Sequence, residues 1–131
     1  MAKLTPKVHE ILGKKAFVHS ASLMEGGSPH VTPTWASIEG ERIVINSERR
    51  RVKPRNLERD PRIALSAADP DNDYSAVFIR GRVVEITTDG AMEHIDELAK
   101  KYMDVDSYPM HQPGDVRIKI YIEADKIGEM P

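Results

Sequence analysis

The last regular stretch of the chain, "RIKIYIEADKI" at residues 117–127, alternates between apolar and polar side chains. Ile118, Ile120 and Ile122 fall on one face, and charged or hydroxyl-bearing residues fall on the other. A period of two predicts a β-strand with one face on a core. A strand of this kind needs neighbouring strands, so the rest of the chain must supply them.

Further strand patterns follow at short intervals and are separated by turn residues. The sequence predicts these strands over residues 15–24, 30–38, 42–47, 62–68 and 75–87. Pro33 cannot donate to a ladder, so it implies an edge, a bulge or a backbone that faces something other than a strand. Gly81 implies a bulge or a bend in the longest strand.

Two segments outside these strands carry helix signals. Thr5 caps a short helix that Gly13 ends. A longer helix, which we expect Asp89 to cap, places five larger or apolar residues at three- and four-residue spacing. These residues are Met92, Ile95, Leu98, Ala99 and Tyr102. Six strands with such helices predict a mainly β (α+β) fold, a six-stranded antiparallel β-barrel with short flanking helices, in one domain over residues 1–131.

Composition excludes several classes of function. The chain has no cysteine, and therefore no disulfide, thiol nucleophile or thiolate metal site. Its five histidines are scattered, which argues against a metal centre. The spacings of a Rossmann fingerprint, a P-loop and a serine-hydrolase elbow are absent. The N-terminus lacks a signal-peptide pattern and no apolar run is long enough to span a membrane, so we expect a soluble, cytoplasmic protein with no membrane partner.

One segment, "NSERRRVKPRNLERDPR" at residues 46–62, concentrates the positive charge. It has six basic residues in the eleven positions 49–59, whereas the whole chain has a net charge of −2. Without those positions, 13 basic residues face 20 acidic ones, a balance of −7. A local cluster in an acidic background suits a small anion better than a long nucleic acid. The segment also lacks the aromatic residues that single-stranded nucleic acids stack on.

We expect the chain to run through Glu48 into a helix that ends at Asp60, just before Pro61. Its first turn would carry Arg49, Arg50, Arg51 and Lys53. Cations at a helix N-terminus oppose the helix dipole, at a cost of about 0.3–1 kcal/mol each, and a phosphate would relieve this cost. A second interpretation stays open, in which the arginines pair with Glu48 and Glu58 on a solvated helix.

Two stretches, "SPHVTPTWASIEGERIVINSERRRVKPRNLERDPRIAL" and "YSAVFIRGRVVEI", together with the late helix, resemble the split-barrel flavin and deazaflavin family. More narrowly, they are similar to the pyridoxamine-phosphate-oxidase-like reductases that use coenzyme F420. The K-x-R-N-L-x-R-D-P-R string at residues 53–62 is the most specific piece. The resemblance implies a homodimer of split β-barrels, with the cofactor ring in a groove at the subunit interface.

The resemblance also implies cofactor-binding residues. The phosphate would be held by Arg51, Lys53 and Asn56, and the ribityl chain and phosphate by Asn46 and Ser47. The backbone of Thr32, Pro33 and Thr34 would meet the pyrimidine edge of the ring, with Trp35 near by. Tyr74 and Ser75 match positions that the family contributes from the second subunit. Trp35 and Tyr74 are equally compatible with packed aromatic residues of the interface.

Within this family, the sequence favours coenzyme F420 over FMN, because Arg49, Arg50 and Arg55 would be spare cations for its acidic tail. The expected reaction is hydride transfer between the reduced deazaflavin and a small organic substrate that the sequence does not identify. No catalytic residue can be named. An FMN-binding oxidoreductase and a non-enzymatic cofactor-binding protein remain alternatives. Members of the family usually carry an N–H where this chain has Pro54, so one phosphate donor is missing.

Overall fold

The computed structural model describes residues 1–131 and contains three helices and seven strands. The helices are α1 (Pro6–Leu12), α2 (Val52–Arg59) and α3 (Ala91–Met103). The strands are β1 (Val18–Leu23), β2 (Pro29–Thr34), β3 (Ala36–Glu39), β4 (Arg42–Glu48), β5 (Arg62–Asp69), β6 (Asn72–Thr87) and β7 (Arg117–Met130). The predicted mainly β class is confirmed. None of the helices combines the length and the apolar character that crossing a membrane requires.

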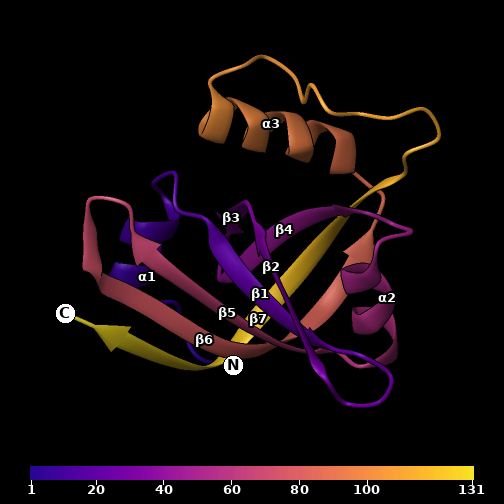
Figure 1. Ribbon diagram of the computed structural model, residues 1–131. Coiled ribbons are helices and arrows are strands. Elements are labelled where there is room, and N and C mark those ends of the chain that lie inside the picture. The colour runs from indigo at the N-terminus through magenta and orange to yellow at the C-terminus, as the bar shows by residue number, and fades with distance from the viewer.

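All seven strands belong to one antiparallel sheet with the order β2-β1-β5-β6-β7-β4-β3. The two edge strands, β2 and β3, are separated in the sequence by Trp35 alone. The sheet must therefore curl until its two edges meet at this residue, and Figure 1 shows the resulting half-barrel. The predicted number of six strands was wrong, because the stretch expected as one strand over 30–38 breaks at Trp35. Pro33 lies in β2, which pairs with β1 only, so the edge position is confirmed.

Gly81 lies at an irregularity in the pairing of β6 with β7, where the register shifts between Arg80 and Gly81. A Cβ atom built on this glycine would lie 2.3 Å from the carbonyl oxygen of Glu123 on β7. The two backbones approach so closely that a side chain at this position would force the strands apart. The predicted bulge or bend at Gly81 is confirmed.

The core fills the inside of the curled sheet and is closed by α1. The three isoleucines of the alternating C-terminal pattern, Ile118, Ile120 and Ile122, are at most 2% exposed. Each fully buried isoleucine stabilises the fold by roughly 1.5–3 kcal/mol. In α1, the Thr5 hydroxyl accepts a hydrogen bond from the Val8 N–H (3.3 Å) and Gly13 is the C-cap, as the sequence predicted.

The long helix α3 lies across the barrel above β3 and β4 in Figure 1. Its N-cap is Gly90 in a left-handed conformation, and no side chain caps it, so the expected cap at Asp89 was wrong. The predicted apolar face is rotated as well, since Met92 is 45% exposed whereas His94 is 3% exposed. A histidine is tolerated on the buried face because both of its ring nitrogens find hydrogen-bonding partners.

The basic segment becomes helical later than expected. Glu48 ends β4, and its carboxylate accepts hydrogen bonds from the N–H groups of Arg50 (2.8 Å) and Val116 (2.9 Å). These bonds hold residues 49–51 in a turn, so that α2 starts at Val52 and its first turn contains only one of the four predicted cations, Lys53. Pro54 lies in that first turn, where the missing N–H breaks no helical bond.

Candidate functional site

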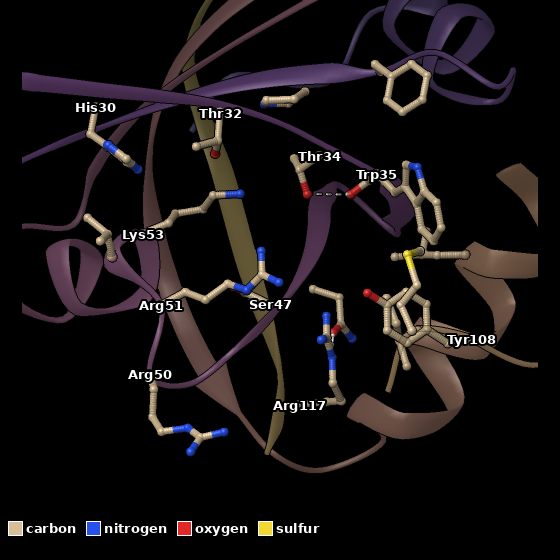
Figure 2. A pocket seen from close by; sticks show the side chains of 17 residues that line it. His30, Thr32, Thr34, Trp35, Ser47, Arg50, Arg51, Lys53, Tyr108 and Arg117 are labelled. Atoms are coloured by element: carbon tan, nitrogen blue, oxygen red, sulfur yellow. Dashed lines mark hydrogen bonds between the residues drawn. The ribbon is translucent and has the colours of Figure 1, made fainter. Parts of the chain in front are cut away.

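A cavity of about 560 Å³ opens beside the break between β2 and β3. Its wall is built from several segments that are distant in the chain: Phe17 before β1, β2 with Trp35, the end of β4 with the turn into α2, the middle of α3, and the loop after α3 with the first residue of β7. The volume falls within the range of about 300–1,000 Å³ that is usual for small-molecule sites. Figure 2 shows the side chains that line it.

The cavity brings together eight of the eleven cofactor-binding residues that the resemblance implied. They are Thr32, Pro33, Thr34, Trp35, Asn46, Ser47, Arg51 and Lys53. The groups 32–35 and 46–53 meet because β3 and β4 form a hairpin that returns the chain to the end of β2. These residues therefore share one site, and their role toward a cofactor stays a prediction.

Three of the predicted residues lie elsewhere. Asn56 is 3% exposed, and its amide donates to the Ser22 hydroxyl (3.1 Å) on β1, so it fastens α2 to the sheet. Tyr74 is 80% exposed at the start of β6, and Ser75 beside it is buried. Neither residue lines the cavity of its own chain, and the role expected from a second subunit stays a prediction.

Two cations face the cavity without a partner. Lys53 is 9% exposed, and its ammonium group makes no hydrogen bond or ion pair; burial, and secondly the charge of Arg51, lower its pKa to about 8. The Arg51 guanidinium is likewise unpaired, and Figure 2 shows both side chains extending into the same space. No acidic residue lines the cavity. An anion would compensate a buried charge that is otherwise unfavourable.

The remaining arginines of the basic segment are less available. Arg50 pairs with Glu48 (3.1 Å) and Asp115 (3.4 Å), so the alternative of local pairing is confirmed for this residue and it is not a spare cation. Hydrogen bonds from the N–H groups of Val116 and Arg50 lower the pKa of Glu48 to about 2, which keeps this carboxylate charged. Arg49 and Arg55 are exposed and lie outside the cavity wall.

The β2 side of the cavity offers polar groups from the backbone and from Thr32. Because β2 is an edge strand, alternate N–H and C=O groups on its free side have no ladder partner. The Thr32 hydroxyl oxygen is the one buried side-chain polar atom without any hydrogen bond. A polar ligand edge that lies along β2 would satisfy these groups.

The opposite side of the cavity is aromatic. Trp35 stacks on Tyr102, with ring centroids 5.2 Å apart and planes 7° from parallel, and its edge meets Tyr108 at 6.1 Å. Tyr102 is itself fixed, because its hydroxyl donates to the Ala16 carbonyl (2.7 Å) and accepts from the Ala36 N–H (3.2 Å). This wall is rigid and largely apolar, and it suits a planar ring.

Several lining residues were not foreseen from the sequence. Tyr108 and Met110 come from the loop after α3, whose path no local pattern predicts. Arg117 begins β7 on the polar side of its alternation, yet it is only 7% exposed and lines the cavity next to Tyr108. His30 on β2 and Phe17, which directly precedes β1, line the cavity as well.

The fold agrees with that of known proteins. The family model of pyridoxamine 5'-phosphate oxidase matches residues 4–124, so the chain belongs to this split-barrel family. No curated protein matches it significantly.

A solved structure named F420 reductase is 27% identical and has a TM-score of 0.80, with 92% of this chain and 94% of that chain covered. Two further structures show the same fold at lower identity. A conserved hypothetical protein of Mycobacterium tuberculosis is 18% identical (TM-score 0.73, 99% and 86% covered). General stress protein 26 of Bacillus anthracis is 15% identical (TM-score 0.71, 95% and 91% covered).

Proposed function

We propose that this protein binds coenzyme F420 in the cavity and acts as an F420-dependent oxidoreductase on a small organic substrate. The observation that carries the proposal is the pair of unpaired cations, Arg51 and Lys53, which face a cavity with no acid in its wall. The similarity to an F420 reductase over most of both chains supports the choice of cofactor.

The residues present fit this cofactor, because they offer complements for a phosphate, a polar ring edge and an aromatic ring. Arg51 and Lys53 would hold the phosphate, and charge-assisted hydrogen bonds of this kind contribute about 1.5–3 kcal/mol each. The free backbone of β2 and the unpartnered Thr32 hydroxyl would take the pyrimidine edge. Trp35 and Tyr108 would exclude water from the ring. When bound, the deazaflavin supplies the hydride chemistry, and the protein supplies position and a dry environment.

FMN is the second candidate, and one observation favours it. The preference for coenzyme F420 rested on spare cations for its acidic tail, but Arg50 is paired and Arg49 and Arg55 lie outside the cavity. The two cations that remain, Arg51 and Lys53, are enough for the single phosphate of FMN. A non-enzymatic protein that stores or delivers either cofactor would use the same site.

We also propose that the functional unit is a homodimer. Large apolar side chains on the outer surface of the sheet remain uncovered: Val31 is 59% and Phe78 47% exposed. A second copy over this surface would bury them and would bring an exposed Tyr74 toward the partner's cavity. The site would then be completed across the interface, as the resemblance implies.

Titration of the purified protein with coenzyme F420, with FMN and with an oligonucleotide tests the proposal. The only tryptophan, Trp35, lies in the cavity wall, so its fluorescence reports binding directly. We expect micromolar binding of coenzyme F420 and no binding of the oligonucleotide. If neither F420 nor FMN binds at micromolar concentration, the proposed function is wrong.

The variant Lys53→Ala tests the proposed phosphate contact. Loss of one charge-assisted contact of about 1.5–3 kcal/mol should raise the dissociation constant for coenzyme F420 about 10- to 150-fold. Arg55→Ala is the matched control, since Arg55 lies on the same helix but outside the cavity wall. Equal affinities of the two variants would place the phosphate elsewhere.

A further inference from the structure

Arg117 is a buried cation that neither the phosphate pair nor the ring site explains. It is 7% exposed and lines the cavity at the first position of β7. Figure 2 shows it rising between Arg51 on one side and Tyr108 on the other, so it faces the aromatic half of the cavity. Its guanidinium carbon lies 5.1 Å from the centre of the Tyr108 ring, which supports one face of the planar group.

A chain of buried hydrogen bonds fixes the orientation of this guanidinium. Its Nε donates to Asn46 Oδ1 (2.9 Å). The Asn46 amide nitrogen donates to the Ala91 carbonyl (2.9 Å) and lies 3.1 Å from His94 Nδ1. His94 Nε2 lies 2.8 Å from the Ser37 hydroxyl, so β3, β4 and α3 all contribute to holding Arg117. Such anchoring resembles the support of a binding group more than that of a surface arginine.

The outer edge of the guanidinium remains free. Only Nε makes a hydrogen bond, and Arg117 takes part in no ion pair. The nearest acids are already engaged, because Glu48 accepts from Val116 and Arg50, and Asp115 pairs with Arg50. Two adjacent NH₂ groups therefore point into a largely apolar space without an acceptor.

The unoccupied edge has a specific chemical complement. The two terminal NH₂ groups of an arginine match the two oxygens of a carboxylate, whereas a lysine offers only a point charge. The neighbouring walls, Trp35 and Tyr108, accept a planar apolar body. A ligand that satisfies both features is a carboxylate attached to an aromatic or conjugated system.

We propose that Arg117 binds a ligand carboxylate in the aromatic half of the cavity, at a subsite separate from the phosphate pair Arg51 and Lys53. The proposal rests on the proposed function in that the cofactor and its substrate share this cavity. A carboxylate is carried both by the tail of coenzyme F420 and by an organic-acid substrate, and the experiment separates these two sources.

The first arm compares benzoate with its neutral analogue benzamide by calorimetry and Trp35 fluorescence. We expect the unmodified protein to bind benzoate at least about tenfold more tightly, because a charge-assisted bidentate contact replaces a neutral one. Arg117→Gln should abolish this preference, and Arg117→Lys, which keeps the charge but loses the fork, should reduce it. Lys53→Ala should leave it intact. A preference that survives Arg117→Gln, disappears in Lys53→Ala or is absent from the unmodified protein overturns the proposal.

The second arm titrates the same variants with coenzyme F420. A weaker affinity in Arg117→Gln together with lost benzoate preference assigns the carboxylate to the cofactor tail. An unchanged affinity together with lost preference assigns it to the substrate. Failure of the unmodified protein to bind coenzyme F420 contradicts the proposed function alone, because the benzoate preference is measured without the cofactor. Thermal unfolding of Arg117→Lys and Arg117→Gln verifies that both variants are folded.

Discussion

At the scale of single residues, the site contains a buried cation without a partner, Lys53, beside the unpaired Arg51. Lys53 is buried at the start of α2, and no acid lies close enough to pair with it. Desolvation penalises the charged form of such an amine, so that its pKa falls. The same desolvation strengthens any contact that the ammonium group makes with an anion. Lys53 is thus destabilising in the free protein and favourable in a complex.

The pKa of Lys53 predicts how anion binding depends on pH. Its value of about 8 lies below the ordinary 10.5, so the free protein loses this charge as the pH rises through 8. We expect the affinity for coenzyme F420 to fall by up to about tenfold between pH 7 and pH 9. Lys53→Arg, whose side chain stays charged in this range, should flatten the profile. Identical profiles of the two proteins would show that Lys53 does not contact the anion.

At the scale of elements, packing overrides local pattern in three places. β2 and β3 form two strands because the chain changes sheet edges at Trp35. α2 starts after the arginine run because Glu48 binds the backbone of the turn. α3 presents His94 rather than Met92 to the barrel because Ser37 and Asn46 satisfy the imidazole. Each departure shapes the wall of the cavity or the support behind it.

The close contact at Gly81 predicts a stability difference. Gly81→Ala should lower the free energy of unfolding by about 1–3 kcal/mol, because the new Cβ atom meets the Glu123 carbonyl oxygen at 2.3 Å and the strands must separate. Chemical denaturation measures this change. Gly26→Ala is the matched control, since nothing lies within 4 Å of its Cβ position. Equal stability of the two variants would contradict the tight pairing of β6 and β7.

The docking of α3 through His94 predicts a loss of stability in acid. Burial, and secondly the charge of Lys119, lower the pKa of His94 to about 4, while Glu39 opposes this shift. The unfolded chain takes up this proton first, so the contribution is present above pH 6.5 and is lost as the pH falls to 4. The stabilisation lost between these pH values amounts to about 2–4 kcal/mol. Chemical denaturation of the unmodified protein and of His94→Gln at several pH values measures this contribution as the difference between their free energies of unfolding. A difference that does not change with pH would contradict the prediction.

At the scale of the whole molecule, the curled sheet encloses the apolar core with its inner surface and leaves some large apolar side chains exposed on its outer surface. On β1, Val18, Ser20 and Ser22 are buried, whereas His19 between them is exposed. His19 lies on the same outer surface as Val31 and Phe78, which are 59% and 47% exposed. An exposed apolar surface of this kind is typical of a protein–protein interface.

The proposed homodimer predicts a measurable mass. Light scattering after gel filtration should give about twice the 14.7 kDa of the chain. Phe78→Glu should shift the mass toward the monomer, because a charge buried at an interface is unfavourable. Met92→Glu is the control, since Met92 is similarly exposed but lies on α3. A monomeric unmodified protein would remove the basis for a contribution of Tyr74 to the partner's site.

The sequence by itself determined the mainly β class, most of the strands, α1 and a bulge or bend at Gly81, and it limited Pro33 to an edge, a bulge or a backbone that faces something other than a strand. These features depend on local periodicity and on the backbone conformation and hydrogen bonding of glycine and proline, which are the same anywhere in a chain. The residues at 32–35 and 46–53 that the resemblance marked also meet in one cavity. Only the tertiary structure decided the break at Trp35, the pairing of Arg50 and the burial of His94 and Arg117. No local pattern specifies partners so far apart in the chain: Arg50 and Asp115 are 65 positions apart, Arg117 and Asn46 are 71, and His94 and Ser37 are 57.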